Sequence, residues 1–311
     1  MKETGQARIH IVLAAYNGAS YIREQLDSVL ANGRDDIWIE ICDDGSTDET
    51  VRIAREYEAR YGCISVYENK ENLGYVKNFI EGIKRSKSPY IMLCDQDDIW
   101  DPDKIARTMR AMERLEQKHG NRESAPLLVF TDAMNFDSDT GKQFGSFHKS
   151  SHLDVAKTDP AHLLMENKCI GCTVMVNAAV LPFLDTLPEE VRVHDWWLAL
   201  ICSQFGEISY LAETTLQYRQ HRGNMIGGSS FSQYVKDRIS HLKRQKESLE
   251  QTFAQGEAFY RLFRDEREEQ PAVRAFARMG NAGFWRRRWY TVRFGFWKSG
   301  WMRNIALLLI L

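Results

Sequence analysis

The chain lacks a strong net charge, a cysteine framework and a long apolar run. Its 41 Lys and Arg residues nearly balance 43 Asp and Glu residues, so attraction of the whole protein to nucleic acid is not expected. Six cysteines are scattered along the chain and no secretory leader precedes Ile9, which favours a reducing cytoplasm without disulfides. The apolar C-terminal segment Ile305–Leu311 is far shorter than the roughly 20 residues that span a bilayer.

Repeats, low-complexity linkers and a second cysteine pair are also absent. Cys169 and Cys172 form a C-x-x-C motif, but a zinc site would need distant partners, so we expect both side chains to pack in a core or a loop. With 311 residues, the chain is long enough for one large domain, or for one of ordinary size with an extension.

The first hundred residues alternate short β-rich runs with helical patterns. This alternation is typical of an α/β fold in which helices cover a mainly parallel sheet. Strands are predicted at residues 9–14, 37–42, 63–67 and 90–94, and helices at about 20–33, 46–60 and 75–85. Ser20 and Ser46 are the expected N-caps of the first two helices. Less regular strands follow at 127–131, 173–176 and 208–211, as expected of a half that receives a second substrate.

The apolar run at 90–94 ends in three closely spaced acids, Asp95, Asp97 and Asp98. Strand periodicity directs Asp95 and Asp97 to the same side, where their charges repel each other unless a cation lies between them. Mg2+ and Mn2+ take carboxylate oxygens and complete their shell with water and substrate phosphates. We therefore expect one of these metals at the end of this strand; a solvated acidic loop is the alternative.

Polar clusters also follow the first two predicted strands. The turn from Tyr16 to Gly18 follows the first strand, and the turn from Asp43 to Ser46 follows the second. In open α/β sheets the ligand lies beyond the carboxyl ends of the strands. The three turns are therefore predicted to converge on one nucleotide-binding site.

These motifs, in this order, resemble those of the inverting glycosyltransferases of family 2, whose catalytic domain has the nucleotide-sugar-binding fold called GT-A. The matching segments are residues 14–18, 43–48, 72–74, 95–98 and 194–197, within a region of roughly 8 to 225. The segment from Tyr218 to His221, followed by Asn224 and Gly227, is similar to bacterial rhamnosyltransferases that build surface polysaccharides. The resemblance implies a GT-A catalytic domain over residues 1–228 and a helical C-terminal region over 229–311.

For the nucleotide, the resemblance implies that Asp44 accepts a hydrogen bond from the imide of a uracil or thymine base. The turn from Ala14 to Tyr16 would pack around that base. The alternative for Asp44, and more so for Asp43, is that the carboxylate only caps the next helix.

For the diphosphate, the resemblance identifies Asp95 and Asp97 with the family's D-x-D motif. Asp97 would bind the metal, and Asp95 would approach the ribose or the metal shell. His221 would close over the diphosphate or complete the metal coordination, with a structural role as the alternative. Arg219 is a second candidate for the phosphate partner.

For the acceptor, the resemblance makes Asp195 the general base that takes the proton of the attacking hydroxyl, a contribution of about 10²–10⁴-fold. Asp195 would also cap a helix. At most one of Trp196 and Trp197 would stack on the acceptor sugar, since tryptophans at the start of a buried helix usually belong to the core. Gly171 would permit close backbone approach to the acceptor, or belong to an ordinary loop.

The segment between Phe284 and Arg303 interleaves aromatic and basic residues and contains no acid. This pattern favours an anionic membrane surface; nucleic-acid binding is the competing interpretation. The resemblance implies a lipid-linked acceptor, and hence a cytoplasmic enzyme peripheral to the inner face of the cell membrane. The polar helices predicted from about 231 to 269 would be a spacer or a homo-oligomerisation element.

The sequence thus predicts a metal-dependent inverting transferase that moves rhamnose from dTDP-rhamnose to a lipid-linked surface glycan. A transferase of the same fold using a UDP-hexose is the first alternative. A nucleotidyltransferase would need a glycine-rich basic loop that residues 14–19 lack. An inactive membrane scaffold is the last alternative, against which the intact Asp95, Asp97 and Asp195 argue.

Overall fold

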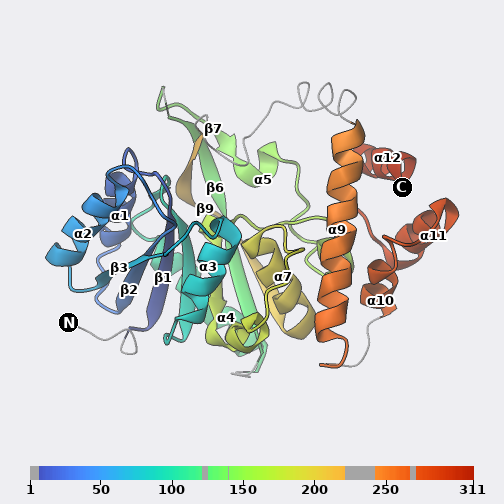
Figure 1. Cartoon of the computed structure of the whole chain (residues 1–311), viewed down its shortest axis with the longest axis horizontal. Helices are drawn as coiled ribbons and strands as arrows, with labels where there is room; N and C mark the ends of the chain where they lie inside the picture. The colour runs from blue at the N-terminus through green and yellow to red at the C-terminus, as the bar shows by residue number, and fades with distance from the viewer. Residues whose placement is uncertain (1–6, 121–124, 139, 221–241, 267–270) are drawn as a thin grey trace.

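A central nine-stranded sheet crosses the molecule, with helices on its faces and a group of C-terminal helices at one end (Figure 1). The computed structural model describes residues 7–120, 125–138, 140–220, 242–266 and 271–311. Its strands are β1 Ile9–Ala15, β2 Ile37–Asp43, β3 Ile64–Glu68, β4 Tyr90–Asp95, β5 Ile99–Trp100, β6 Leu127–Asp137, β7 Gln143–Ser146, β8 Met175–Asn177 and β9 Glu207–Gln220. Its α-helices are α1 Ile22–Leu30, α2 Thr50–Arg60, α3 Tyr75–Lys84, α4 Lys104–Lys118, α5 Phe147–Ser150, α6 Pro160–Met165, α7 His194–Phe205, α9 Leu242–Phe263, α10 Pro271–Ala277, α11 Phe284–Phe294 and α12 Trp301–Ile310. The 3₁₀ helices within the described residues are η2 Gly171–Thr173 and η3 Ala178–Leu184.

The first half of the sheet is parallel, as the sequence predicts. Its strand order is β3-β2-β1-β4, and every pair in it is parallel. All seven residues of β2 and six of the seven in β1 are buried, because helices cover both faces of the sheet. The carboxyl ends of β1, β2 and β4 therefore lie side by side at one edge.

The second half of the sheet mixes directions. Strand β8 is antiparallel to both β4 and β6, while β6 and β9 run parallel and β5 closes the far edge antiparallel to β9. The β6–β9 ladder shifts register near Thr131 and Asp132, which bends the long strands. Strands β6 and β9 extend well beyond the predicted segments at 127–131 and 208–211.

The C-terminal helices pack onto this fold. Phe259 of α9 lies edge-on to Trp197 of α7, with ring centroids 5.3 Å apart. Phe253 and Phe276 join α9 to α10 with a centroid distance of 5.6 Å. Because α9 buries one face in this core, the prediction that it is a spacer is wrong. Residues 231–241 of that prediction lie outside the described residues.

The two predicted serine caps are also wrong. No side-chain bond from Ser20 reaches the start of α1. Ser46 does not cap α2, since its hydroxyl is hydrogen-bonded to Asp43 within the turn. Asp48 instead accepts the amide of Thr50 at 3.0 Å, so an aspartate satisfies the first turn of α2.

Candidate active site

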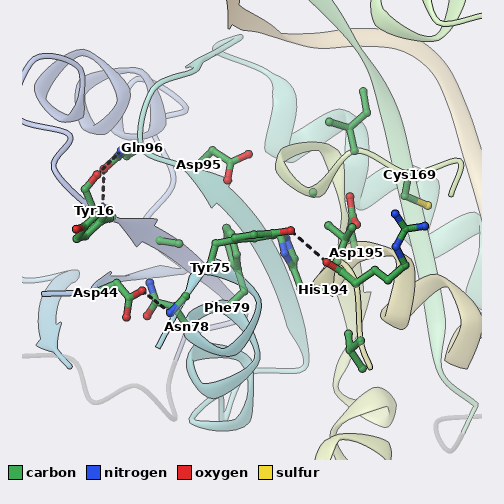
Figure 2. A pocket seen from close by; sticks show the side chains of 18 of the residues that line it. Tyr16, Asp44, Tyr75, Asn78, Phe79, Asp95, Gln96, Cys169, His194 and Asp195 are labelled. Carbon is green, nitrogen blue, oxygen red and sulfur yellow. Dashed lines mark hydrogen bonds between the residues drawn. The ribbon is translucent and has the colours of Figure 1, made fainter. Parts of the chain in front are cut away.

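The turns after β1, β2 and β4 line one cavity of about 1080 Å³. The cavity continues past α3 to the start of α7 and to α9 of the C-terminal region. Its lining includes Ala14, Tyr16, Asp44, Asn72, Tyr75, Asn78, Asp95, Gln96, Asp97, Gly171, Glu189, Glu190, Arg192, His194, Asp195, Gln251 and Ala254. Figure 2 shows Tyr16, Asp44 and Gln96 at one end of the cavity, Asp95 near its middle and Asp195 toward the other end. We call the end around Asp44 the donor half and the end around Asp195 the acceptor half.

The two aspartates after β2 have different surroundings. The Asp43 carboxylate is hydrogen-bonded within its own turn, where it accepts the amides of Gly45 at 3.1 Å and Ser46 at 2.9 Å. Asp44 reaches across to the loop before α3 and accepts the amides of Leu73 at 2.8 Å and Gly74 at 2.9 Å. Only Asp44 of the two lines the cavity.

The wall beside Asp44 is fixed by a reciprocal pair of hydrogen bonds. The Gln96 side chain accepts the Tyr16 amide at 2.9 Å and donates to the Tyr16 carbonyl at 3.0 Å (Figure 2). This pair joins the turn after β1 to the turn after β4. The Tyr16 ring stays about half exposed, so its face is available to a planar ligand.

Two carboxylates and a thiol lie close together at the end of β4. One ligand atom each of Asp95, Asp98 and Cys172 lies within 4.8 Å of the other two. Burial and the charges of Asp97 and Asp195 raise the pKa of Asp95, and burial raises that of Asp98 in the same way. Asp98 is fully buried, and its Oδ2 atom has no hydrogen-bond partner among the described residues.

This donor set fits a hard divalent cation. A bound cation would relieve the repulsion between the acids and satisfy the unpartnered Asp98 oxygen. Asp95 and Asp97 line the cavity, whereas Asp98 lies behind them. Burial raises the pKa of the Cys172 thiol, which keeps it protonated and makes it a poor ligand for Mg2+ or Mn2+.

Arg219 lies outside the cavity lining. Its Nε atom donates to the carbonyl of Asp97 at 2.7 Å, and its guanidinium forms an ion pair with Glu24. Arg219, the expected phosphate partner, therefore holds the backbone of the acidic turn and does not face the cavity. His221, the other expected partner, lies outside the described residues.

Asp195 lies in the first turn of α7 and lines the acceptor half. Its Oδ1 atom accepts the Asn167 side chain at 3.0 Å and the Trp196 amide at 2.6 Å. Burial nevertheless raises its pKa to about 7, a value that suits a general base at neutral pH. The charge of Asp195 also raises the pKa of Asp95.

His194 and Gly171 pack against this acid. The His194 ring stacks on Phe79 with a centroid distance of 4.0 Å, and burial lowers its pKa to about 3. A Cβ atom on Gly171 would lie 2.7 Å from Nε2 of His194, so any side chain there would force the buried His194 ring to shift. Glycine therefore lets this loop approach Asp195 closely.

The two tryptophans after Asp195 do not face the cavity, which corrects their predicted role at the acceptor. Trp196 is buried and its indole donates to the Leu163 carbonyl at 2.5 Å. Trp197 is fully buried between α7 and α9. Because α7 is apolar on nearly all sides, its tryptophans belong to the core.

Several residues of the site carried no predicted role. Gln96 lies inside the acidic motif, so its spacing could have suggested a contact with the first turn. Asn167 lies in a segment considered for the acceptor but received no role. Arg192 and Gln251 had no local signal, because long-range packing of α9 brings them to the cavity.

Comparison with known proteins gives a match to one family profile and a shared fold. The sequence profile of glycosyl transferase family 2 matches residues 10–123. The dTDP-rhamnosyl transferase RfbG of Shigella flexneri is 28% identical over 230 residues, which cover 70% of this chain and 74% of that protein. The chain spans 58% of the length of the uncharacterized mycobacterial proteins that it also matches.

Two solved structures show the same fold. The S. aureus TarS fragment 1–349 in complex with UDP-GlcNAc superposes with a TM-score of 0.57 at 16% identity, covering 88% of this chain and 71% of that one. The mannosyltransferase PcManGT from Pyrobaculum calidifontis, in complex with GDP-Man and Mn2+, gives a TM-score of 0.56 at 17% identity, covering 97% and 78%.

Proposed function

We propose that the chain transfers a sugar from a nucleoside diphosphate to a hydroxyl of a lipid-linked glycan, because residues 10–123 match the glycosyl transferase family 2 profile and the chain has the GT-A fold. The proposal rests on one observation: Asp44, Asp95, Asp97 and Asp195 line a single cavity. These acids could bind a nucleobase, hold a cation and take the proton of an attacking alcohol. They face one space, as a transfer between two substrates requires.

The donor half holds the nucleotide in this proposal. Asp44 accepts the imide N–H of uracil or thymine, and Tyr16 covers one face of the base. Asp44 is suited to this because two backbone amides already fix its carboxylate. A carboxylate held in place loses little conformational entropy when it accepts one more donor.

Asp95 and Asp97 would hold Mg2+ or Mn2+ against the diphosphate, with Asp98 behind them. When bound, the cation would neutralise the charge that grows on the leaving diphosphate. Arg219 keeps the acidic turn in place through its bond to the Asp97 carbonyl. His221 remains a proposed partner of the diphosphate or the metal.

Asp195 acts as the base. Its carboxylate takes the proton of the acceptor hydroxyl while that oxygen attacks the anomeric carbon from the face opposite the diphosphate. The bond from the anomeric carbon to the diphosphate oxygen breaks, and the configuration inverts. Asn167 and the Trp196 amide hold one carboxylate oxygen, which leaves the other to receive the proton.

The transferred sugar is proposed to be rhamnose from a dTDP donor, since the printed name of RfbG describes a dTDP-rhamnosyl transferase. A UDP-hexose is the second candidate, because the fold is shared with a TarS fragment in complex with UDP-GlcNAc. Residues 1–228 would form the catalytic domain. The helical region 229–311 would contribute a cavity wall through α9, in addition to any role at a membrane.

A peripheral membrane contact is proposed for α11 and α12. Their outward faces expose Trp285 at 80%, Leu309 at 76% and Trp301 at 71%, beside the exposed Arg286 and Arg293. Aromatic and basic side chains together favour an anionic lipid surface. Among the described residues, no helix combines the length and the apolar character that crossing a bilayer requires.

Donor hydrolysis tests the proposal. The protein is incubated with dTDP-rhamnose and a panel of UDP-hexoses, with Mn2+ and with excess chelator. We expect metal-dependent release of the nucleoside diphosphate from dTDP-rhamnose. Release only from a UDP-hexose would remove the rhamnosyl assignment, and unchanged release in chelator would remove the metal role.

A further inference from the structure

One cation on the cavity wall has no acidic partner. Arg192 lies in the loop before α7, and its guanidinium donates to two hydroxyls of α9, those of Thr252 at 2.6 Å and Ser248 at 3.0 Å. Among the described residues no carboxylate forms an ion pair with it. Burial lowers the pKa of Arg192, but a guanidinium keeps its charge at neutral pH.

Other partly buried arginines of this chain have carboxylate partners. Arg85 pairs with Glu40, Arg287 pairs with Glu250 at 2.7 Å, and Arg303 pairs with Glu166. A charge removed from water without a counter-ion is costly unless something else offsets it. Arg192 is therefore an exception, and it lies at a ligand cavity.

The guanidinium is also held in a fixed position. Ser248 and Thr252 are four residues apart and share one face of α9, so they bind Arg192 from the same side. Gln255 of the same helix accepts the Arg192 amide at 2.9 Å, and the Trp196 ring lies 5.4 Å from the guanidinium carbon. Two of the five N–H groups of Arg192 bind these hydroxyls, which leaves the others for a ligand.

Arg192 is the side chain of the cavity lining that carries a positive charge and could attract an anion. Among the lining residues, all of them described, Arg192 is the single Arg or Lys, whereas six are Asp or Glu. Asp95 and Asp97 would bind the donor diphosphate through a metal ion. The Arg192 guanidinium is then left for a second negative group.

The position of Arg192 relative to the base limits where that group lies. Arg192 and Asp195 are three residues apart, so their Cα atoms are at most about 11 Å apart. The cavity, at about 1080 Å³, exceeds the roughly 300–1,000 Å³ typical of a single small-molecule pocket. It therefore has room for an anionic acceptor beside the donor.

We propose that Arg192 binds a phosphate of the acceptor, so that the acceptor is a short sugar joined to its lipid by phosphate rather than the distant neutral end of a long glycan. The guanidinium fork suits phosphate oxygens, which accept two N–H groups at once. This inference rests on the proposed function, and it names the chemical class of the acceptor.

Binding of inorganic phosphate tests the site directly. Phosphate is titrated calorimetrically into the full-length protein, alone and with the donor half saturated by UDP or dTDP and Mn2+. We expect phosphate to bind in both states and Arg192→Gln to weaken it by at least tenfold, since hydrogen bonds to charged groups contribute about 1.5–3 kcal/mol. Nucleotide affinity should change less than twofold.

Arg244→Gln is the matched control, because Arg244 is an exposed arginine of α9 that does not line the cavity. It should leave phosphate binding unchanged. Thr252→Ala keeps the charge of Arg192 but removes one hydroxyl that holds it, so a smaller loss is expected. This variant decides the question if Arg192→Gln does not fold.

Three results would overturn the proposal: no phosphate binding by the wild-type protein, equal phosphate binding by Arg192→Gln, or a parallel loss of nucleotide affinity in that variant. The last result would assign Arg192 to the donor diphosphate. Failure of the wild-type protein to bind UDP or dTDP would refute the proposed function instead, and the phosphate titration without nucleotide would still test the anion site.

Discussion

The two halves of the cavity are built in different ways. In the donor half, Asp44, Tyr16 and Gln96 come from turns at the ends of neighbouring parallel strands, and backbone amides fix them. In the acceptor half, Asp195 depends on Asn167 from a distant loop and lies near α9 of the C-terminal region.

This difference predicts which half tolerates change. Strand-end turns are fixed by the sheet, so a substitution there should act locally on nucleotide binding. The acceptor half depends on long-range contacts, since the loop that carries Asn167 is held by Glu166, which pairs with Lys168 and with Arg303 of α12. Changes in the C-terminal helices should therefore reach the acceptor half and leave the donor half intact.

Asp195→Asn should separate the halves most strongly. The amide cannot take the acceptor proton, so transfer should fall about 10²–10⁴-fold while nucleotide affinity stays the same. Initial rates and nucleotide titrations on the same preparation measure both. Asp185→Asn, at an exposed site, is the control, and unchanged turnover of Asp195→Asn would exclude this residue as the base.

Glu166→Gln should show that the C-terminal helices support the acceptor half. It leaves Lys168 and Arg303 without their buried counter-charge, and breaking such a pair costs about 3–5 kcal/mol of unfolding free energy. Denaturant titration measures this loss of unfolding free energy. Glu113→Gln, which breaks an exposed pair with Arg8, should cost at most about 1 kcal/mol. Equal losses would contradict the structural role of Glu166.

Asp44→Asn should affect the donor half alone. Loss of the charged acceptor should weaken UDP or dTDP binding about 10- to 100-fold, as removal of a charge-assisted hydrogen bond does. Asp36→Asn, at the other end of the same strand region, should have no effect. If nucleotide affinity does not fall, Asp44 serves only to hold the loop before α3.

Acidification should weaken the acceptor half through His194. Burial lowers its folded pKa to about 3, whereas the unfolded ring titrates near 6.5. The contribution of neutral His194 to the free energy of unfolding is thus complete above pH 6.5. It is lost as the pH falls toward 3, by about 1.4 kcal/mol per pH unit. His194→Phe should remove this part of the slope in denaturant titrations from pH 7 to pH 5. An unchanged slope would show that His194 does not cause this pH dependence.

The smallest expected effect is at the outer face of α11 and α12. Replacing both Trp285 and Trp301 by alanine should weaken binding to anionic vesicles about tenfold, because exposed indoles settle at lipid headgroups. Stability should hold, since both rings are exposed. Deleting residues 284–311 would be a poorer test of membrane binding. It would also remove Ser299 and Arg303, which bind Glu166. Equal vesicle binding by the double variant would contradict the assignment.

The same contrast explains what could be predicted from the sequence. The strands β1, β2 and β4 and the acids after them were predicted because strand periodicity and strand-end position are local signals. The positions of Trp197 and Arg219 were not, because a local motif does not reveal burial by α9 or a bond to the Asp97 carbonyl. Arg192 and Gln251 reach the cavity only through tertiary packing.

The central claim is that one cavity holds the nucleotide, the cation and the base. A crystal of the full chain soaked with UDP or dTDP and Mn2+, with anomalous scattering to locate the manganese, tests it most directly. We expect the ion between Asp95 and Asp97, the nucleobase at Asp44 and an open path from the ion to Asp195. A manganese ion away from the two acids, or a nucleotide bound away from Asp44, would contradict the account.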